Sequence, residues 1–389
     1  MTARERYLGV MRGEPGVQTL FWEFGYWAAA LDRWYHEGLP RSCFSLTPGL
    51  PAAMSICGEG LSWPSLETGE VYRDIDVHRY LNLDAGAVRV HVRHRGYPPF
   101  REEVLEEDSS TVTLINPAGV KVRLSKNTGS VPQFLAWPVM DRNSWEKIKE
   151  ERFALDMAGR FPDRWTEVAA SYRQRDFPLG VLLDGFFAGP RELMGVEHLL
   201  LAYYDDPQLI HDINTHLTEL YLAILEEIFG QVELDFVYFW EDMSYNAGPL
   251  ISPALFDEFI VPYYRRLTDF IKNRGVDIIM VDTDGDCEKL IPGFLKGGIT
   301  GLYPFEVHAG MDIVAVRQQF PELMVMGGLD KLAVARGKEA IDAELQTRLP
   351  AMLVQGRYIP CLDHLVQPGV SWEDFCYYRQ RLGDYVCNR

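Results

Sequence analysis

Acidic side chains and two histidines follow the apolar runs of this 389-residue sequence, at the points where the runs give way to polar residues. In chain order they are Glu23, Asp184, Glu241 with Asp242, Asp282 with Asp284 and Asp286, Glu306 with His308, Asp330 with Lys331, and Asp363 with His364. Carboxylates and imidazoles transfer protons and bind divalent metal ions. If the fold brings the ends of these runs together, the residues form one polar site.

Asp282 and Asp284 are the most informative pair. Residues two apart on a strand face the same side, and adjacent carboxylates repel unless a cation or a proton lies between them. An ion held by carboxylate oxygens and one imidazole would be zinc or another borderline metal, and a metal-free acid–base pocket is the alternative. For Asp242, Asp286 and Asp330 a structural role is favoured, because an acidic residue after a strand often caps the next helix.

Aromatic residues gather near the same run ends. They are Phe21, Trp22, Phe24, Tyr26 and Trp27, then Phe186 and Phe187, and then Tyr238, Phe239, Trp240, Tyr245, Tyr303 and Phe305. We expect about half of them to pack in the core. The others would line a pocket for an apolar or aromatic ligand.

Short apolar runs alternate with amphipathic stretches over most of the chain. The runs are 18–24, 177–185, 234–242, 276–286, 299–306, 322–330 and 356–364. Between the second and third, apolar residues from Leu209 to Ile224 recur at three- and four-residue steps, which predicts a helix within 207–228. This alternation predicts an α/β fold, a (β/α)8 TIM barrel with its catalytic groups at the carboxyl ends of the strands. An open, doubly wound sheet is the alternative.

Residues 66–140 do not follow this alternation of apolar runs and amphipathic stretches. The stretches VRVHVRHRG and TVTLINPAGVKVRL, with Gly, Asn and Pro in the turns between them, predict β-hairpins. We expect an inserted antiparallel layer near the mouth of the barrel.

Composition limits the possible partners. The chain has 56 acidic and 38 basic residues, a formal net charge of -18, which repels nucleic acid and acidic lipids. The cysteines lack CxxC spacing, and no secretory signal or membrane-spanning run is visible, so we expect a cytoplasmic protein with reduced thiols. The patterns GxGxxG, GxxxxGK[ST] and GxSxG are also missing, which gives no support to dinucleotide, Walker-type or serine-hydrolase sites.

Six stretches resemble the uroporphyrinogen decarboxylase superfamily, which includes corrinoid-dependent methyltransferases. They are RERYLGVMRGE, GVLLDGFFAGPRELMG with the YDDP that follows, WEDMSYNAGPLISPALFDEFIVPYY, VDTDGDCEKLIPGFLKGGITGLYPFE, MGGLDK and DHLVQPGVSWEDF. The resemblance covers nearly all of the chain outside 66–140. It implies one TIM-barrel domain over residues 1–389.

Two departures narrow the resemblance. Where the decarboxylases have an RQAGRYLPEY-type loop whose arginines hold porphyrinogen carboxylates, this chain has FWEFGYWAAALDRW with Glu23. Where the methyltransferases bind zinc through His-x-Cys and a later Cys, it has Asp282 and Asp284, and then Cys361 or His364. The resemblance therefore implies an oxygen-rich site, similar to that of O-demethylase methyltransferases.

The expected activity is methyl transfer from a small methylated substrate, a methoxylated aromatic compound, to the cob(I)alamin of a separate corrinoid protein. The corrinoid is expected on a partner because the DxHxxG signature is absent. The alternative is a decarboxylase or lyase of the same fold, and a non-catalytic corrinoid or tetrapyrrole binder is a third option. The sequence leaves open the methyl donor and whether the chain forms a homodimer.

The resemblance also suggests residue roles. Asp284, Glu306 and His364 are expected to bind Zn²⁺, and Glu241 and Asp282 to act as proton donor or further ligand. The expected substrate contacts are Trp22, Glu23, Tyr26, Trp27, Phe186, Phe187, Tyr245 and Tyr303.

Overall fold

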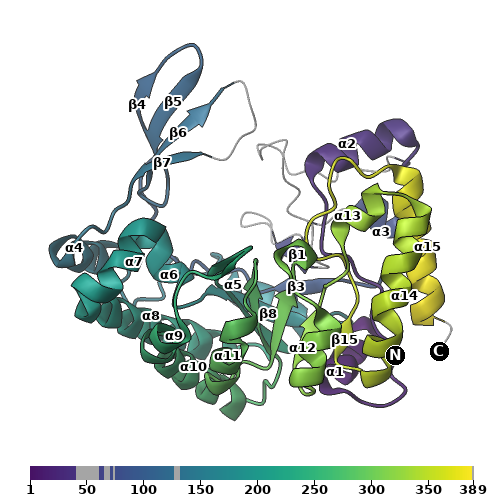
Figure 1. Cartoon of the computed structure of the whole chain (residues 1–389). Helices are drawn as coiled ribbons and strands as arrows, with labels where there is room; N and C mark the ends of the chain where they lie inside the picture. The colour runs from purple at the N-terminus through teal and green to yellow at the C-terminus, as the bar shows by residue number, and fades with distance from the viewer. Residues whose placement is uncertain (41–60, 65–70, 73–74, 127–131, 388–389) are drawn as a thin grey trace.

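A computed structural model describes residues 1–40, 61–64, 71–72, 75–126 and 132–387 (Figure 1). Part of the predicted 66–140 insertion, and the cysteines Cys43 and Cys57, lie outside these residues.

A nine-stranded sheet forms the centre of the molecule, in the order β15-β14-β13-β12-β9-β8-β3-β1-β2. Its strands are β1 (Leu61–Pro64), β2 (Val71–Tyr72), β3 (Ala87–Arg89), β8 (Leu179–Asp184), β9 (Phe236–Trp240), β12 (Ile279–Thr283), β13 (Gly301–Pro304), β14 (Met324–Met326) and β15 (Tyr358–Ile359). The β1–β2 pair is antiparallel and the other pairs are parallel. The parallel strands curl as in a TIM barrel, which confirms the predicted fold class.

Side chains of the parallel strands alternate between two cores. Tyr238 and Met280 belong to a cluster inside the barrel, whereas their neighbours Val237, Phe239 and Val281 pack outward against the helices. The alternation is the two-residue repeat of a strand, and both faces are apolar because helices cover the outside. Each run is therefore almost continuously apolar, as the sequence indicated.

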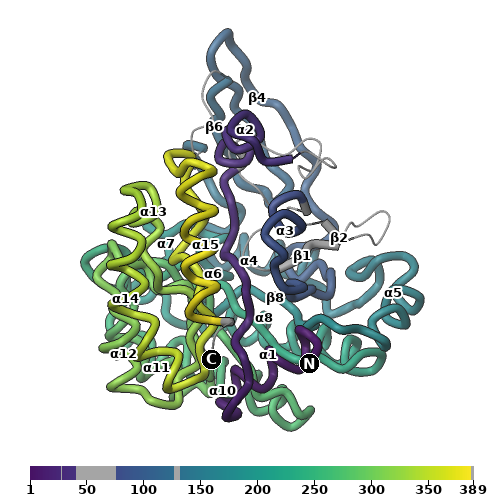
Figure 2. The backbone as a smooth tube through the Cα atoms, turned by 90° about the vertical axis from the view of Figure 1, so that its right-hand side faces the viewer, coloured from purple at the N-terminus to yellow at the C-terminus, as the bar shows by residue number. Residues whose placement is uncertain are grey.

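Residues 18–24 are not a strand, which corrects the prediction for this segment. The segment still lies beside β15, because the Thr19 hydroxyl donates to the Tyr358 carbonyl oxygen at 2.7 Å and Tyr26 forms a parallel bridge with Val366. On its other side the Phe21 N–H donates to the Asp84 carboxylate at 2.7 Å. Part of its backbone hydrogen bonding thus goes to side chains instead of a continuous ladder. In Figure 2 this stretch runs beside α15 (Trp372–Cys387).

Helices surround the sheet. Besides α15 they are α1 (Ala3–Arg12), α2 (Ala28–Glu37), α3 (Ile75–Leu81), α4 (Arg142–Arg152), α5 (Trp165–Ser171), α6 (Ala188–Met194), α7 (Val196–Asp205), α8 (Pro207–Phe229), α9 (Pro253–Phe259), α10 (Val261–Asn273), α11 (Ile291–Lys296), α12 (Ile313–Gln319), α13 (Lys331–Ala335) and α14 (Lys338–Gln355). The predicted helix is α8, which begins where the Asp206 carboxylate accepts the Leu209 N–H. Its apolar stripe is buried from Leu209 to Ile224. Within the described ranges, no helix combines the length and the apolarity that crossing a membrane requires.

An antiparallel sheet lies within the segment that was predicted as an insertion. Strands β4 (Glu103–Glu107), β5 (Thr111–Ile115), β6 (Lys121–Ser125) and β7 (Gln133–Ala136) form a separate sheet that stands away from the barrel in Figure 1. The VRVHVRHRG stretch is not a hairpin, because it begins as β3, which pairs with β8 in the main sheet. It supplies a parallel strand that the sequence pattern did not reveal.

A buried ion pair joins the N-terminal segment to the last helix. Arg379 on α15 donates to the Glu23 carboxylate at 2.9 Å, and the two side chains are 1% and 0% exposed. The other Glu23 oxygen accepts the N–H groups of Phe24 and Leu362. Glu23 is therefore part of the fold's internal structure, which gives no support to the substrate contact expected for it.

Replacing Arg379 should test this pair. Arg379→Met leaves the Glu23 charge buried without its partner, so we expect about 3–5 kcal/mol less stability in urea-induced unfolding. Arg381→Met, two residues further along the same helix, removes partly exposed pairings with Asp342 and Asp384 and should change the unfolding midpoint much less. Equal losses in the two variants would contradict the assignment.

Candidate functional site

The ends of four neighbouring strands form one layer at the carboxyl side of the barrel. Asp184, Trp240, Asp282 and Tyr303 are partners in register across β8, β9, β12 and β13. Tyr303 belongs to the interior cluster, and Leu182, two residues before Asp184, packs against that cluster. Two of the strand-end carboxylates, Asp184 and Asp282, therefore share this layer, with Trp240 on the strand between them.

Asp184 is neutralised by a cation from the segment after β3. Arg95 donates two hydrogen bonds to its carboxylate, at 2.7 and 2.9 Å, and His94 Nε2 lies 3.2 Å from it. Burial opposes ionisation of Asp184, but the charges of Arg95 and His94 hold its pKa well below the usual range. Arg95 also lies over the Trp240 ring, 5.3 Å from its centre. Asp184 is thus a fixed anion.

A second group combines Asp242, Asp284 and His364. The backbone N–H of Asp284 donates to the Asp242 carboxylate at 3.4 Å. The side-chain carboxylate of Asp284 lies 3.5 Å from His364 Nε2. Burial and the charge of Asp284 raise the pKa of Asp242 to about 6. Burial lowers the pKa of His364, but its contact with Asp284 outweighs this and the net shift is upward. The pKa values of Asp242 and His364 are thus both shifted upward, so Asp242 retains its proton to a higher pH than an ordinary aspartate.

Arg191, on α6, is the cation nearest to Asp242. Its Nη1 donates to the Asp242 backbone oxygen at 2.6 Å, while its Nη2 is 4.0 Å from the carboxylate. The guanidinium lies 4.6 Å from the centre of the Trp240 ring. Asp242 is thus held by the backbone and is only weakly paired through its side chain. Asp242 does not cap a helix, because α9 is capped by Ser252.

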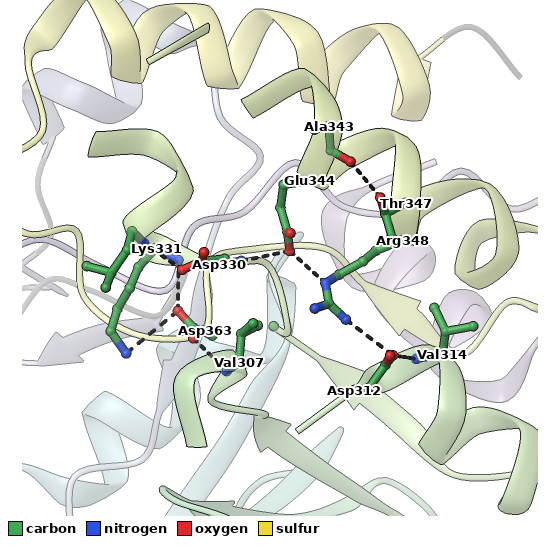
Figure 3. A network of polar contacts seen from close by, with 12 residues as sticks. Val307, Asp312, Val314, Asp330, Lys331, Ala343, Glu344, Thr347, Arg348 and Asp363 are labelled. Atoms are coloured by element: carbon green, nitrogen blue, oxygen red, sulfur yellow. Dashed lines mark hydrogen bonds and ion pairs between the residues drawn. The ribbon is translucent and has the colours of Figure 1, made fainter. Parts of the chain in front are cut away.

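Lys331 neutralises the carboxylates at the ends of β13 and β15. Its Nζ lies 2.8 Å from Glu306 and 3.7 Å from Asp363. Asp363 also accepts the N–H groups of Lys331 and Val307, and Figure 3 shows it between these residues. Glu306 in turn accepts the Gly285 N–H at 3.1 Å. Gly285 has φ +78°, and a Cβ there would lie 2.5 Å from the Ser244 backbone, so this close approach requires glycine.

Asp330 has the structural role that the sequence indicated. Its carboxylate accepts the Leu332 N–H and caps α13. It also contacts Arg336 at 2.8 Å and His308 at 3.0 Å. Its backbone N–H donates to Glu344, which continues the network of Figure 3.

Glu241 holds the start of α6 and is not open to a substrate. It is fully buried and accepts the N–H groups of Phe186, Phe187 and Ala188 at 2.9–3.0 Å, together with the Tyr264 hydroxyl. Burial raises its pKa to about 7, although these donors favour the anion. The structure therefore gives no support to the catalytic role expected for Glu241. Asp282 lies in the strand-end layer, and its role stays a prediction.

The expected aromatic contacts are mostly in the core. Trp22 belongs to the interior cluster, whereas Tyr26, Phe186 and Phe187 pack outside the barrel. Trp27 is partly buried against both cores, and Tyr245 is 54% exposed on the β10 (Ser244–Tyr245) and β11 (Gly248–Pro249) hairpin. Of the eight predicted contacts, Tyr303 is the one that lies in the strand-end layer. Glu23, the eighth, is buried with Arg379.

Three residues near the site were missed or undervalued. Arg95 and His94 follow β3, in the stretch that was predicted as a hairpin, so nothing placed them at a strand end. Trp240 was one of many aromatic residues, and its position between Asp184 and Asp282 follows only from strand register. A reading of VRVHV as a barrel strand would have identified the two cations after it.

Comparison with known proteins now identifies the family. The family model for uroporphyrinogen decarboxylase (URO-D) matches residues 108–378. The chain belongs to the uroporphyrinogen decarboxylase (URO-D) family. The URO-D match includes β5 to β7 of the insertion and every strand-end residue of the site from Asp184 to His364. No curated protein matches the sequence.

Solved structures share the fold at low sequence identity. A methyltransferase from Methanosarcina mazei superimposes with a TM-score of 0.57 and 12% identity, over 98% of this chain and 99% of that one. A protein described as a vitamin-B12-independent methionine synthase from Listeria monocytogenes has a TM-score of 0.33 and 12% identity, over 54% of this chain and 64% of its own. The first likeness supports the barrel fold, and the second is too weak to carry an argument.

The predicted zinc ligands do not gather around one point. Asp284 and His364 are in contact, but Glu306 is paired with the Lys331 ammonium group. Within the described part of the chain, no three His, Cys, Asp or Glu side chains form a group that could hold a metal ion. In this URO-D family member the Lys331 ammonium group lies next to Glu306, at the place where the predicted site would have a zinc ion. Zinc binding stays a prediction, and the positions of these side chains do not support it.

Chelation should distinguish the two arrangements around Glu306. Because Lys331 already neutralises Glu306 and Asp363, we expect prolonged treatment with a chelator to leave the thermal unfolding midpoint unchanged. Elemental analysis of the purified protein supplies the second measurement. About one zinc ion per chain, lost together with stability in Glu306→Ala and His364→Ala, would instead support the zinc site.

Proposed function

We propose that this chain is a cytoplasmic methyltransferase that moves a methyl group from a methoxylated aromatic compound to the cob(I)alamin of a separate corrinoid protein. The URO-D family membership and the barrel shared with a methyltransferase from Methanosarcina mazei support the general class. The observation that carries the proposal is Asp242, a carboxyl group with a pKa of about 6 beside Asp284 and His364 at the barrel mouth.

The reaction needs a proton donor. Breaking the bond between the ether oxygen and the methyl carbon leaves the electron pair on oxygen, so a phenolate departs unless a proton reaches it. The corrinoid of the partner protein would supply the nucleophile that accepts the methyl group. Asp242 would give its proton to the departing oxygen, and the neighbouring His364 could then restore it through Asp284.

Charge at the mouth is arranged to assist this step. Arg191 donates to the Asp242 backbone, so its positive charge lies close to any negative charge that develops on the oxygen. Trp240 offers an aromatic surface in the same layer, although Arg95 and Arg191 both lie against it. Because Asp184 and Glu306 are paired with Arg95 and Lys331, Asp242 is the carboxyl group best suited to release a proton.

One observation favours the alternative, a decarboxylase or lyase acting on a carboxylated substrate. The site contains more cations than the sequence suggested, because Arg95 joins Arg191 and Lys331 around the mouth. However, Arg95 and Lys331 form close ion pairs with carboxylates of the protein. A polyanionic substrate would have to displace those carboxylates, which makes methyl transfer from an uncharged donor the better-supported proposal.

The pH dependence of the reaction should identify the acid. Asp242 is protonated below its pKa and loses its proton above it, so kcat should fall as the pH rises through about 6. Asp242→Asn should lower kcat by about 100-fold or more and remove that pH step. Asp286→Asn is the matched control, because Asp286 lies on the adjacent loop and its carboxylate accepts the Glu288 N–H, a bond that the asparagine side-chain oxygen can also accept. An unchanged pH profile in Asp242→Asn would exclude this residue as the acid.

Substrate charge gives a separate measurement. We expect 2-methoxyphenol to bind more tightly than uroporphyrinogen in equilibrium titrations, because burial of one ring contributes several kcal/mol at about 25 cal/mol per Å² while added carboxylates meet an acidic protein. Methyl transfer from 2-methoxyphenol to added cob(I)alamin should accompany this binding. Tighter binding of uroporphyrinogen would favour the decarboxylase.

A further inference from the structure

A cavity of about 250 Å³ lies beside the barrel, between the insertion and helices α4, α6 and α8. Its walls are mainly apolar side chains, with Ile148 from α4, Phe153 directly after α4, Leu193 from α6, and Leu217 and Tyr221 from α8. None of the substrate or metal residues expected from the sequence lines it. A cavity of roughly 150 Å³ can hold benzene, so this one has room for a single substituted ring.

Polar groups are confined to one end. Asp184, Arg95, Glu192 and His94 all contribute to the lining. Arg95 pairs with Asp184 on one side and lies 3.1 Å from Glu192 on the other. These groups include both hydrogen-bond donors and acceptors, so a hydroxyl group could donate to a carboxylate and accept from the guanidinium. The two carboxylates leave no excess positive charge for an anion.

One side of the cavity is formed by the turn between β5 and β6, the NPAG sequence of residues 116–119. Pro117 and Ala118 line the cavity from this turn. The Asn116 side chain accepts the N–H groups of Ala118 and Val120, both at 3.0 Å, and the Pro117 carbonyl accepts the Phe100 N–H at 2.9 Å. The turn is therefore held in place by hydrogen bonds, and the cavity exists without a ligand to shape it.

We propose that this cavity binds an uncharged, single-ring aromatic molecule that carries one hydroxyl group. The apolar walls take the ring, and the Asp184–Arg95–Glu192 end takes the hydroxyl. A ring bound there adjoins the barrel mouth, because Arg95 contacts both Asp184 and the Trp240 ring. The inference rests on the proposed methyl transfer and names a holding site, next to the mouth, for its phenolic donor or product. Asp242 does not line this cavity, so a donor held there would move to the mouth before its methyl group is removed. Binding in the cavity needs no corrinoid.

The environment disfavours an anionic ligand. Burial, followed by the negative charge of Asp184, raises the pKa of the Tyr221 phenol well above its usual value. The same two effects would act on a carboxylate or phenolate that entered the cavity. A neutral phenol avoids both.

Calorimetric titration of the full chain with three probes tests the chemistry. We expect 2-methoxyphenol to bind, toluene to bind about tenfold more weakly because it lacks the hydrogen-bonding group, and benzoate to bind weakest. Benzoate binding as tightly as 2-methoxyphenol would overturn the assignment to neutral ligands. Absence of binding by all three, up to their solubility limits, would overturn the site itself.

Two tryptophan substitutions locate the binding. Ala118 is exposed and lies on the cavity rim, so Ala118→Trp should fill the opening and abolish binding of 2-methoxyphenol without disturbing a core residue. Ser109→Trp makes a similar change in the exposed β4–β5 turn, away from the cavity, and should bind as the unmodified chain does. Circular dichroism and thermal unfolding confirm that both variants are folded.

The pattern of results separates this site from the proposed reaction. Binding that survives in Ala118→Trp would place the ligand elsewhere and overturn the cavity assignment, even if methyl transfer occurs. Binding that is lost in Ala118→Trp supports the cavity, even if no methyl transfer is detected with any corrinoid. The two proposals can therefore fail independently.

Discussion

Neutralisation of buried carboxylates across neighbouring elements is the interaction on which this site depends. The ends of parallel strands bring acidic side chains together in a region of low solvent access, where like charges repel strongly. Arg95 neutralises the charge of Asp184, and Lys331 neutralises the charges of both Glu306 and Asp363. Each cation comes from a different part of the chain than the carboxylates it neutralises. The positions of the loops after β3 and β14 are thus tied to the charges at the barrel mouth.

The negative charge of Asp242 is only weakly neutralised by nearby cations, and Asp242 is the residue that we propose as the proton donor. Arg191 is directed mainly to the Asp242 backbone oxygen, while its contact with the carboxylate is long at 4.0 Å. Asp284 adds a second negative charge, and His364 is the group that balances it. A carboxyl group that is partly buried and incompletely paired retains its proton to a higher pH than usual. The same feature that costs electrostatic stability makes proton donation possible near neutral pH.

The insertion and the barrel together line one cavity. The barrel supplies Asp184 at the end of β8, and the segment after β3 supplies Arg95. The β5–β6 turn of the insertion closes the space above them with Pro117 and Ala118. The cavity therefore forms at a junction between two sheets, next to the polar layer of the barrel, and none of the aromatic residues that the sequence suggested as pocket walls lines it.

The sequence by itself determined the fold class, helix α8 and most strand positions, because burial repeats of two and 3.6 residues are local properties. It also indicated that carboxylates would meet, since parallel strands place their carboxyl ends on one side of a barrel. Only the tertiary structure decided which carboxylates are accessible. Glu23 and Glu241 resemble Asp242 in sequence context, yet Glu23 is buried by Arg379, far along the chain, and Glu241 by the N–H groups that begin α6. The state of an ionisable group depends on partners that are distant in sequence, and no local pattern encodes them.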